Sequence, residues 1–189
     1  MYHYRTFPLN HLRSLLFVVL LMVGLVLAAC AGAPPTAQQP TGDLVAIWAG
    51  KVEGTDAFIG IVSNGKDVMA YVCDGKTISQ WFQGQVNGDK LDLSAGNAKL
   101  QTQLTRDTTS GSVTLANGQF KFTATRTTGD AGLYRSDETI NNEKWVGGWI
   151  VLNDGQLRGA NVQQTTGRIV TQTALTNVAR LIKPQLDLY

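Results

Sequence analysis

Closely spaced turn signals divide most of this chain into segments of about five to nine residues, the length of β-strands. The turn signals are the pairs Asn64-Gly65, Asp74-Gly75, Asn87-Gly88, Ala95-Gly96, Ser110-Gly111, Asn117-Gly118 and Asp154-Gly155. Asn, Asp and Gly adopt the positive φ angles that tight hairpin turns need. The segments between them are rich in Val, Ile, Thr and aromatic residues, which favours an antiparallel β meander.

The middle segments alternate between apolar and polar residues, so each has one buried and one solvated face. Leu91 and Leu93 alternate with Lys90, Asp92 and Ser94, and residues 98–104 and 113–124 follow the same pattern. Two other segments, 56–73 and 145–152, are apolar on both faces. We therefore expect another part of the chain to cover their second face.

The C-terminal segment is the predicted cover. Its apolar residues fall at helical spacing: Ala174, Leu175, Val178, Ala179, Leu181 and Ile182. Pro184 would end such a helix. A strand over Ile169–Leu175 that closes the barrel is the alternative. We predict an all-β fold, an antiparallel meander forming a barrel or barrel-like sandwich of about 8–10 strands, with a short C-terminal helix. Residues 43–189 are expected to form this single domain.

The N-terminus has the pattern of an export signal. Arg5 and Arg13 precede an uninterrupted apolar run, Leu15–Leu27, as in a secretory signal peptide. Leu27-Ala28-Ala29-Cys30 then resembles the lipobox of bacterial lipoproteins. The resemblance implies cleavage after Ala29 and lipid attachment to Cys30.

The predicted organisation is a signal peptide over residues 1–29, followed by lipidated Cys30 at the start of a flexible, proline-rich tether over 30–42. The protein is then exported and lipid-anchored to a bacterial membrane in the cell envelope, where several acyl chains hold it stably. An uncleaved transmembrane helix is the alternative, because the apolar run and its uncharged flanks are long enough to span a bilayer.

Processing also changes the composition. The chain has 16 Lys and Arg and 14 Asp and Glu; removing Arg5 and Arg13 leaves 14 of each and a formal charge of zero. Both histidines also lie in the signal peptide. The mature domain therefore lacks the residues for Ser-His-Asp catalysis and for His-ligated zinc, and it has no basic run for nucleic acid. We expect no metal, no cofactor and no nucleic-acid partner.

The remaining cysteine and the acidic residues point the same way. Cys73, in an apolar run, is expected to be a buried small residue rather than a reactive thiol. Asp137 and Glu138 are adjacent and would point to opposite faces of a strand, so with Glu143 they make a poor pair of catalytic carboxylates. We expect a protein that is not an enzyme. Gly147-Gly148, inside a strand, indicates a bulge or a close backbone approach.

Aromatic residues are the candidate ligand surface, because Trp and Tyr combine an apolar body with a polar atom. The candidates are Trp48, Tyr71, Trp81, Trp145 and Trp149. Trp145 and Trp149, four residues apart, should share one strand face. The alternative is that these side chains fill the interior of the barrel.

Residues 57–135 resemble a module found in secreted and membrane-tethered bacterial proteins, with Ala70–Gly75, Trp81-Phe82-x-Gly84 and Ala131–Arg135 among the matching motifs. The resemblance implies a recurring fold without an assigned function. Tyr71-x-Cys73-Asp74-Gly75 is also similar to a stretch in the lipoprotein inhibitors of C-type lysozyme, whose cysteine is typically paired, whereas Cys73 has no partner.

The predicted function is that of a monomeric, non-catalytic binding module in the cell envelope. Its partners would be the membrane, through the lipid on Cys30, and an envelope protein, a glycan or a small apolar ligand. The alternatives are an inhibitor of an envelope-directed hydrolase, with a protruding polar loop, and a small-ligand-binding barrel, with an open cavity lined by Trp.

Overall fold

Antiparallel β-strands make up the described part of the chain almost entirely. The computed structural model describes residues 44–184, all within one compact unit. In that range the strands are β1 (Val45–Val52), β2 (Phe58–Asn64), β3 (Asp67–Cys73), β4 (Ser79–Gln85), β5 (Lys90–Ala95), β6 (Ala98–Gln103), β7 (Thr108–Leu115), β8 (Gly118–Arg126), β9 (Gly132–Ile140), β10 (Glu143–Val151), β11 (Leu157–Gln163), β12 (Ile169–Gln172) and β13 (Arg180–Leu181). The predicted all-β, antiparallel class is confirmed.

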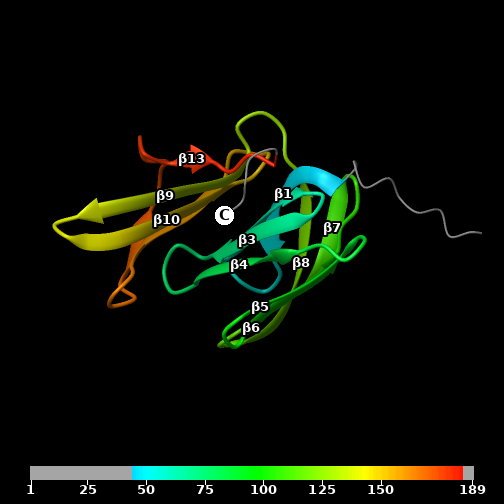
Figure 1. Ribbon diagram of the computed structural model, residues 1–189, viewed down its shortest axis with the longest axis horizontal. Coiled ribbons are helices and arrows are strands. Elements are labelled where there is room, and N and C mark those ends of the chain that lie inside the picture. Colours follow the sequence, from blue (N-terminus) through cyan, green and yellow to red (C-terminus); the bar gives the residue numbers. More distant parts are fainter. Residues whose placement is uncertain (1–43, 185–189) are drawn as a thin grey trace, which may run out of the picture. The chain divides into compact units, whose positions relative to one another are not determined.

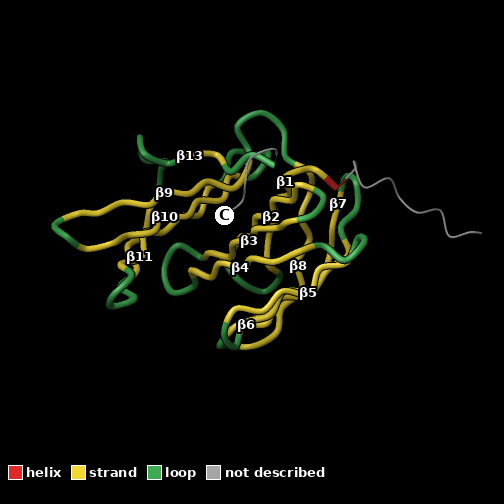
Figure 2. Tube along the Cα trace, in the orientation of Figure 1, coloured by secondary structure: helices red, strands yellow, loops and turns green. Residues whose placement is uncertain are grey.

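The first eight strands form one sheet, in the order β4-β3-β2-β1-β8-β7-β6-β5, which curls into a nearly closed barrel (Figures 1 and 2). Neighbours in the chain pair in this sheet, except where β1 joins β8 and where the chain passes from β4 to β5. Gly50 of β1 lies so close to β8 that a Cβ there would come within 1.9 Å of the Thr123 carbonyl oxygen. Only glycine allows this approach.

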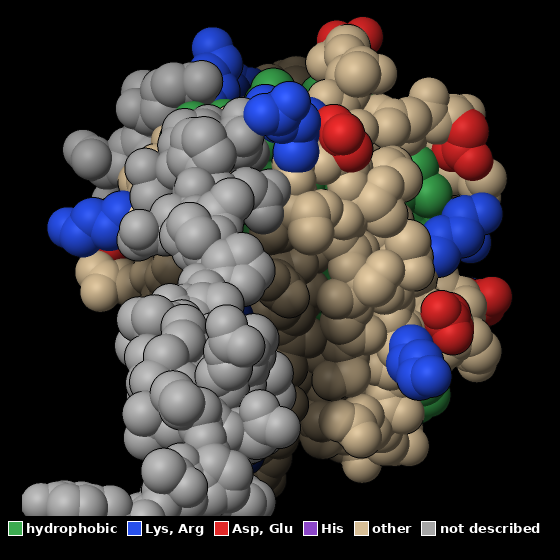
Figure 3. Space-filling model, turned by 90° about the vertical axis from the view of Figure 1, so that its right-hand side faces the viewer, with side chains coloured by type: hydrophobic (Ala, Val, Ile, Leu, Met, Phe, Trp, Pro, Cys, Tyr) green, Lys and Arg blue, Asp and Glu red, His purple; other side chains and the backbone are tan. Residues whose placement is uncertain are grey.

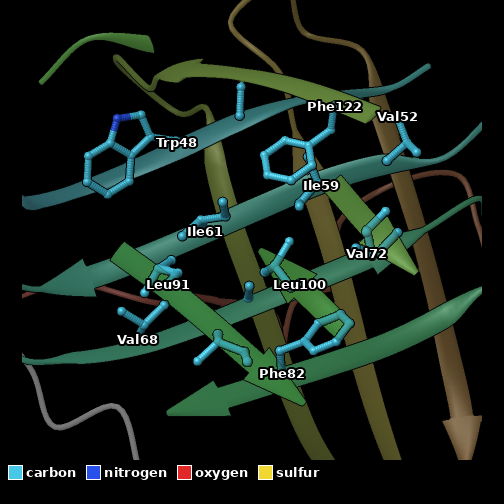
Figure 4. Close-up of a cluster of buried hydrophobic side chains, with 14 of the residues drawn as sticks. Trp48, Val52, Ile59, Ile61, Val68, Val72, Phe82, Leu91, Leu100 and Phe122 are labelled. Atoms are coloured by element: carbon cyan, nitrogen blue, oxygen red, sulfur yellow. The ribbon is translucent and has the colours of Figure 1, made fainter. Parts of the chain in front are cut away.

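The inside of the barrel is filled by the apolar side chains that the alternating pattern assigned to one face. Leu91, Leu93, Leu100 and Phe122 are all nearly inaccessible to solvent. Figure 4 shows that side chains of opposite strands point toward one another across the interior, Phe82 from one side and Phe122 from the other. The interior is therefore a packed core.

The remaining strands form a second sheet, in the order β12-β11-β10-β9-β13. Its inner face packs on the outside of β1, β2 and β3, and a second apolar cluster lies between the two layers: Ile47, Ala49, Phe58, Val62, Met69, Tyr71, Cys73, Leu133, Ile150, Leu152 and Ala160. The segments that are apolar on both faces thus cover each other.

The predicted C-terminal helix is wrong. Residues 174–179 form turns and irregular backbone, and Arg180 and Leu181 add a short strand to the edge of β9. The N–H of Ile182 donates to the carbonyl oxygen of Leu133 (2.9 Å). The edge of β9 offers unpaired backbone groups, and pairing with them satisfies this segment better than a helix of one or two turns, which is marginal on its own.

The alternative assignment, a last strand over Ile169–Leu175, is half right. Ile169–Gln172 is β12, but it pairs with β11 at the edge of the second sheet and does not close the barrel.

The predicted signal peptide, Ala29, Cys30 and the tether all lie outside the described residues. Within residues 44–184, no helix is long and apolar enough to cross a membrane. On the part of the described surface that Figure 3 shows, basic and acidic side chains are interspersed and hydrophobic side chains form only small patches.

Candidate functional site

The two sheets meet at a stack of two aromatic rings. Tyr71 of β3 and Trp81 of β4 lie opposite each other in the ladder, with ring centroids 4.2 Å apart and planes inclined by 25°. Gly148 of β10 lies against both: a Cβ there would come within 2.6 Å of the Tyr71 ring and 2.7 Å of Trp81 Cζ2. The Gly147-Gly148 pair therefore marks a close backbone approach, as predicted.

Arg135 of β9 extends the stack with its cationic group. Its guanidinium carbon lies 4.9 Å from the centroid of Trp81, a cation–π distance. Two nitrogens of the same group, Nε and Nη2, donate to the carboxylate of Asp137 at 2.7 and 2.8 Å. Asp137 thereby fixes the guanidinium over the indole, while Nη1 has no acceptor among the described residues.

This stack forms one wall of an open groove of about 580 Å³ between the barrel and the second sheet. The other lining side chains are mostly amides, hydroxyls and small apolar groups: Ser79, Gln80, Gln83, Ser94, Ala95, Val146, Val162 and Gln164. They come from the ends of β4 and β5 and from β10, β11 and the turn after β11. The groove thus combines hydrogen-bonding side chains, one aromatic edge and one cation.

Below the groove, the polar atoms of Tyr71 and Cys73 are buried. The Tyr71 hydroxyl shares a hydrogen bond with Ser79 Oγ (2.8 Å), and the Cys73 thiol accepts one from the Gly75 N–H (3.2 Å). Burial raises the pKa of the Cys73 thiol and that of the Tyr71 hydroxyl. Both groups are uncharged at neutral pH, so Cys73 is the buried small residue that its sequence context predicted.

Asp74 organises the turn that leads into β4. Its carboxylate accepts hydrogen bonds from the backbone N–H groups of Lys76, Thr77 and Ile78 at 2.7 to 2.8 Å, and from the Thr77 hydroxyl. Partial burial would raise the pKa of Asp74, but these hydrogen bonds outweigh it and hold the pKa below its ordinary value. The turn positions Ser79 and Gln80 at the mouth of the groove.

The structure separates the five aromatic candidates. Tyr71 and Trp81 belong to the stack, but Trp48 lies inside the barrel, fully buried, with its Nε1 donating to the Thr105 carbonyl oxygen (3.1 Å). Trp145 and Trp149 share one face of β10, as predicted, and it is the face turned away from the barrel.

Trp149 lies flat across two glycines of its own sheet. A Cβ at Gly147 would come within 2.4 Å of its Cη2, and one at Gly159 within 2.2 Å of its Cδ1. The indole is fully buried, and its N–H has no hydrogen-bond partner in the described part of the chain. Trp145, also buried, carries Arg168 over its ring at 4.9 Å. Neither indole lines the groove.

The acidic residues considered as a catalytic pair diverge. Asp137 and Glu138 lie on opposite faces of β9, where Asp137 binds Arg135 and Glu138 accepts from Ser136 Oγ at 3.1 Å. Among the described residues that line the groove, none carries a carboxylate. Among residues 44–184, no three His, Cys, Asp or Glu side chains come close enough together to hold a metal ion.

Comparison of the chain with protein families, with curated proteins and with solved structures finds no match. The resemblances drawn from short motifs therefore remain predictions.

Sequence reasoning found the aromatic half of this site and missed Arg135 as its polar half. The groove combines strand ends from both sheets, and the strand pattern alone does not say which ends meet. The signal that pointed here was Gly148, since a strand glycine without a turn role indicates that a bulky group lies opposite.

Proposed function

We propose that this protein is a non-catalytic binding protein of the cell envelope, tethered to a membrane by lipid on Cys30, and that the groove between its two sheets receives the partner. The observation that carries the proposal is the placement of Arg135. The Arg135 guanidinium is held over Trp81 by Asp137, and its Nη1 has no acceptor in the described part of the chain. A group fixed before binding adds little ordering cost when a partner binds.

The composition of the groove supports a polar partner. Three glutamines and two serines line it, and each can donate or accept a hydrogen bond. The barrel interior, filled by Trp48, Phe82 and Phe122, offers no comparable space and gives no support to a ligand held inside the barrel.

The test measures binding by the full chain of soluble cell-wall glycan fragments and of envelope proteins, with Arg135→Gln as the main variant. We expect this variant to bind at least about tenfold more weakly, because a buried or half-buried charge-assisted hydrogen bond contributes on the order of 1.5 to 3 kcal/mol. Arg168→Gln is the matched control, because Arg168 makes the same cation–π contact with Trp145 outside the groove. Equal losses in both variants would contradict the groove as the binding site.

The tether is tested separately. Metabolic labelling with a fatty-acid analogue and detergent partitioning should show a lipid-bearing protein that becomes water-soluble when Cys30→Ala is introduced. A Cys30→Ala protein that still partitions with detergent would favour the uncleaved transmembrane helix.

A second candidate is an inhibitor of an envelope-directed hydrolase, supported by the β9–β10 hairpin. Its tip has only exposed residues from Thr139 to Lys144, and Asn141 and Asn142 take positive φ angles of 50° and 65° in a tight turn. In Figure 1 the hairpin extends beyond its neighbours β11 and β13. Inhibition of C-type lysozyme that Asn142→Pro abolishes would support this candidate, and the absence of inhibition would remove it.

A further inference from the structure

We propose that the partner of this groove is an extended polypeptide segment that pairs its backbone with the open edge of β4. The inference rests on the proposed binding function and names the class of partner. It follows from the way the barrel fails to close between β4 and β5.

The hydrogen bonds of β4 with β3 show which backbone groups point outward. The ladder is bounded by the Val86 N–H donating to the Lys66 carbonyl (2.8 Å) and the Asp74 N–H donating to the Ile78 carbonyl (3.2 Å). Bonded and non-bonded pairs alternate along an antiparallel ladder. In this register the even-numbered residues of β4 bond to β3. The N–H and C=O groups of Trp81 and Gln83 therefore point away from the sheet.

The outer edge of β5 has the same property. At the base of the β5–β6 ladder, the Leu104 N–H donates to the Asp89 carbonyl (2.7 Å). By the same alternation, the odd-numbered residues of β5 form their backbone hydrogen bonds with β6. The backbone groups of Asp92 and Ser94 point away from β6, toward the side on which β4 lies.

The edges of β4 and β5 are paired only next to the turn that connects the two strands, within the described residues. Asn87 and Lys90 exchange two backbone hydrogen bonds, of 3.0 and 3.1 Å. The same register would pair Gln83 with Ser94, but in the described chain no ladder joins β4 to β5, and these strands are the two ends of the sheet. Gly84 receives the Leu93 side chain instead, since a Cβ there would lie 2.6 Å from Leu93 Cδ2. On the interior face of the barrel, this side-chain contact joins β4 and β5 without backbone pairing.

One side-chain hydrogen bond on β4 takes the place of a backbone bond from a neighbouring strand. The side-chain amide of Gln80 folds back and donates to the carbonyl oxygen of its neighbour Trp81 (2.8 Å). A glutamine thus supplies a donor at the place where an adjacent strand would have one. Within residues 44–184, no ladder or bridge pairs the N–H of Trp81 or the backbone groups of Gln83 with β5.

A row of outward-pointing backbone donors and acceptors selects an extended peptide, because only another strand presents complementary groups at the same spacing. The open edge lies in the groove, and Trp81 and Gln83 belong to both. A strand added there would point every second side chain toward Arg135, whose Nη1 has no acceptor within residues 44–184. We infer that the peptide carries a carboxylate or amide at that position.

The probe is a pool of random ten-residue peptides, from which binders to the full chain are selected and their affinities measured. The decisive variant is Gln83→Pro. Proline removes the outward N–H and leaves the bonds to β3 intact, since prolines are tolerated where an edge N–H faces solvent. Gln83→Ala is the matched control, because it keeps the N–H. We expect Gln83→Pro to bind at least about tenfold more weakly than Gln83→Ala, because both variants lack the glutamine side chain and only Gln83→Ala keeps the outward N–H.

A second measurement leaves the protein unaltered, in case Gln83→Pro does not fold. Selected peptides are resynthesised with N-methyl groups on alternate residues, which blocks strand pairing on one edge. We expect one of the two methylation patterns to abolish binding and the other to preserve it.

Three results would overturn the inference: no peptide that binds more tightly than about 1 mM, binding that survives both methylation patterns, or a dimer that Gln83→Pro dissociates, which would assign the edge to a second copy of the chain. Peptide binding lost in Arg135→Gln but unaffected by Gln83→Pro would leave the groove proposal standing and remove strand pairing.

Discussion

Gly148 lies against the ring of Tyr71 so closely that a Cβ at residue 148 would approach the ring to 2.6 Å. This contact joins the second sheet to the barrel beneath the groove. Gly148 is in β10 and Tyr71 in β3, so two parts of the chain far apart in sequence depend on one missing side chain.

Gly148→Ala should therefore destabilise the fold by about 1 to 3 kcal/mol, because the extra methyl overpacks a filled interface. Urea unfolding measures the loss. The matched background is Trp81→Ala, which removes the second close neighbour of residue 148 and lets Tyr71 shift. In the Trp81→Ala background, Gly148→Ala should lower the free energy of unfolding clearly less than in the wild type. An equal loss in both would mean that the Tyr71–Trp81 stack does not limit how closely β10 approaches the barrel.

Asp74→Asn should reduce stability at neutral pH and lose this effect in acid. The folded pKa of Asp74 lies below its unfolded value of about 3.9. The ionised carboxylate therefore contributes stability above pH 4, and this contribution disappears as pH falls through the folded pKa. The stability difference between wild type and Asp74→Asn should shrink steadily below pH 4. A difference that stays constant from pH 7 to pH 2.5 would contradict a role for the charge.

Cys73 should be unreactive in the folded protein and reactive when it unfolds. Burial excludes reagents and raises the pKa of the thiol, so an aromatic disulfide reagent at pH 8 should modify Cys73 only at the rate of unfolding. The raised pKa also has a stability consequence. The unfolded thiol ionises above about pH 8.5 while the folded thiol does not, so stability should fall as pH rises beyond that value.

The Cys73→Ser variant is the control for the alkaline effect, since it removes the thiol and keeps a small side chain. Its stability should change less between pH 8 and pH 9.5 than that of the wild type. Rapid labelling of the native protein would show that the strand pair around Cys73 opens readily.

Most of the fold could be predicted from turns and alternation. The Asn-Gly and Asp-Gly pairs fall at strand ends or between strands, because their geometry is local and needs no tertiary information. Ser110-Gly111 is the exception: Gly111 lies inside β7, where a Cβ would come within 2.2 Å of the Gln101 carbonyl oxygen. Here glycine permits close contact between strands. Ser110 favours a turn less strongly than Asn or Asp does, and this was the sequence signal against a turn at Ser110-Gly111.

The packing of the two sheets could not be predicted, because the sequence pattern does not say which apolar surfaces meet. The apolar faces of residues 56–73 and 145–152 were expected to need a cover, but they cover each other, and a helix was assigned to the role instead. Leu175, one of the apolar residues of that helix, is 40 % exposed. Helical spacing in a short segment does not decide between a helix and an edge strand, because an open strand edge stabilises the extended conformation through backbone pairing that the spacing does not reveal.

Trp48→Ala should be among the most damaging single changes. Its indole is fully buried in the barrel interior, so truncation should cost about 3 to 5 kcal/mol and leave a cavity. Trp48→Phe should cost less, because it retains most of the apolar volume and loses only the hydrogen bond to Thr105. A Trp48→Ala protein of wild-type stability would mean that the barrel interior is not the packed core described above.

Amide hydrogen exchange along β4, followed by nuclear magnetic resonance, tests the open edge most directly. An open edge predicts alternation: the N–H groups of Trp81 and Gln83 exchange orders of magnitude faster than those of Gln80 and Phe82, and they become protected when a selected peptide is added. Uniform protection of all four amides in the unliganded protein would contradict it, because the barrel would then be closed and β4 would have no edge to offer.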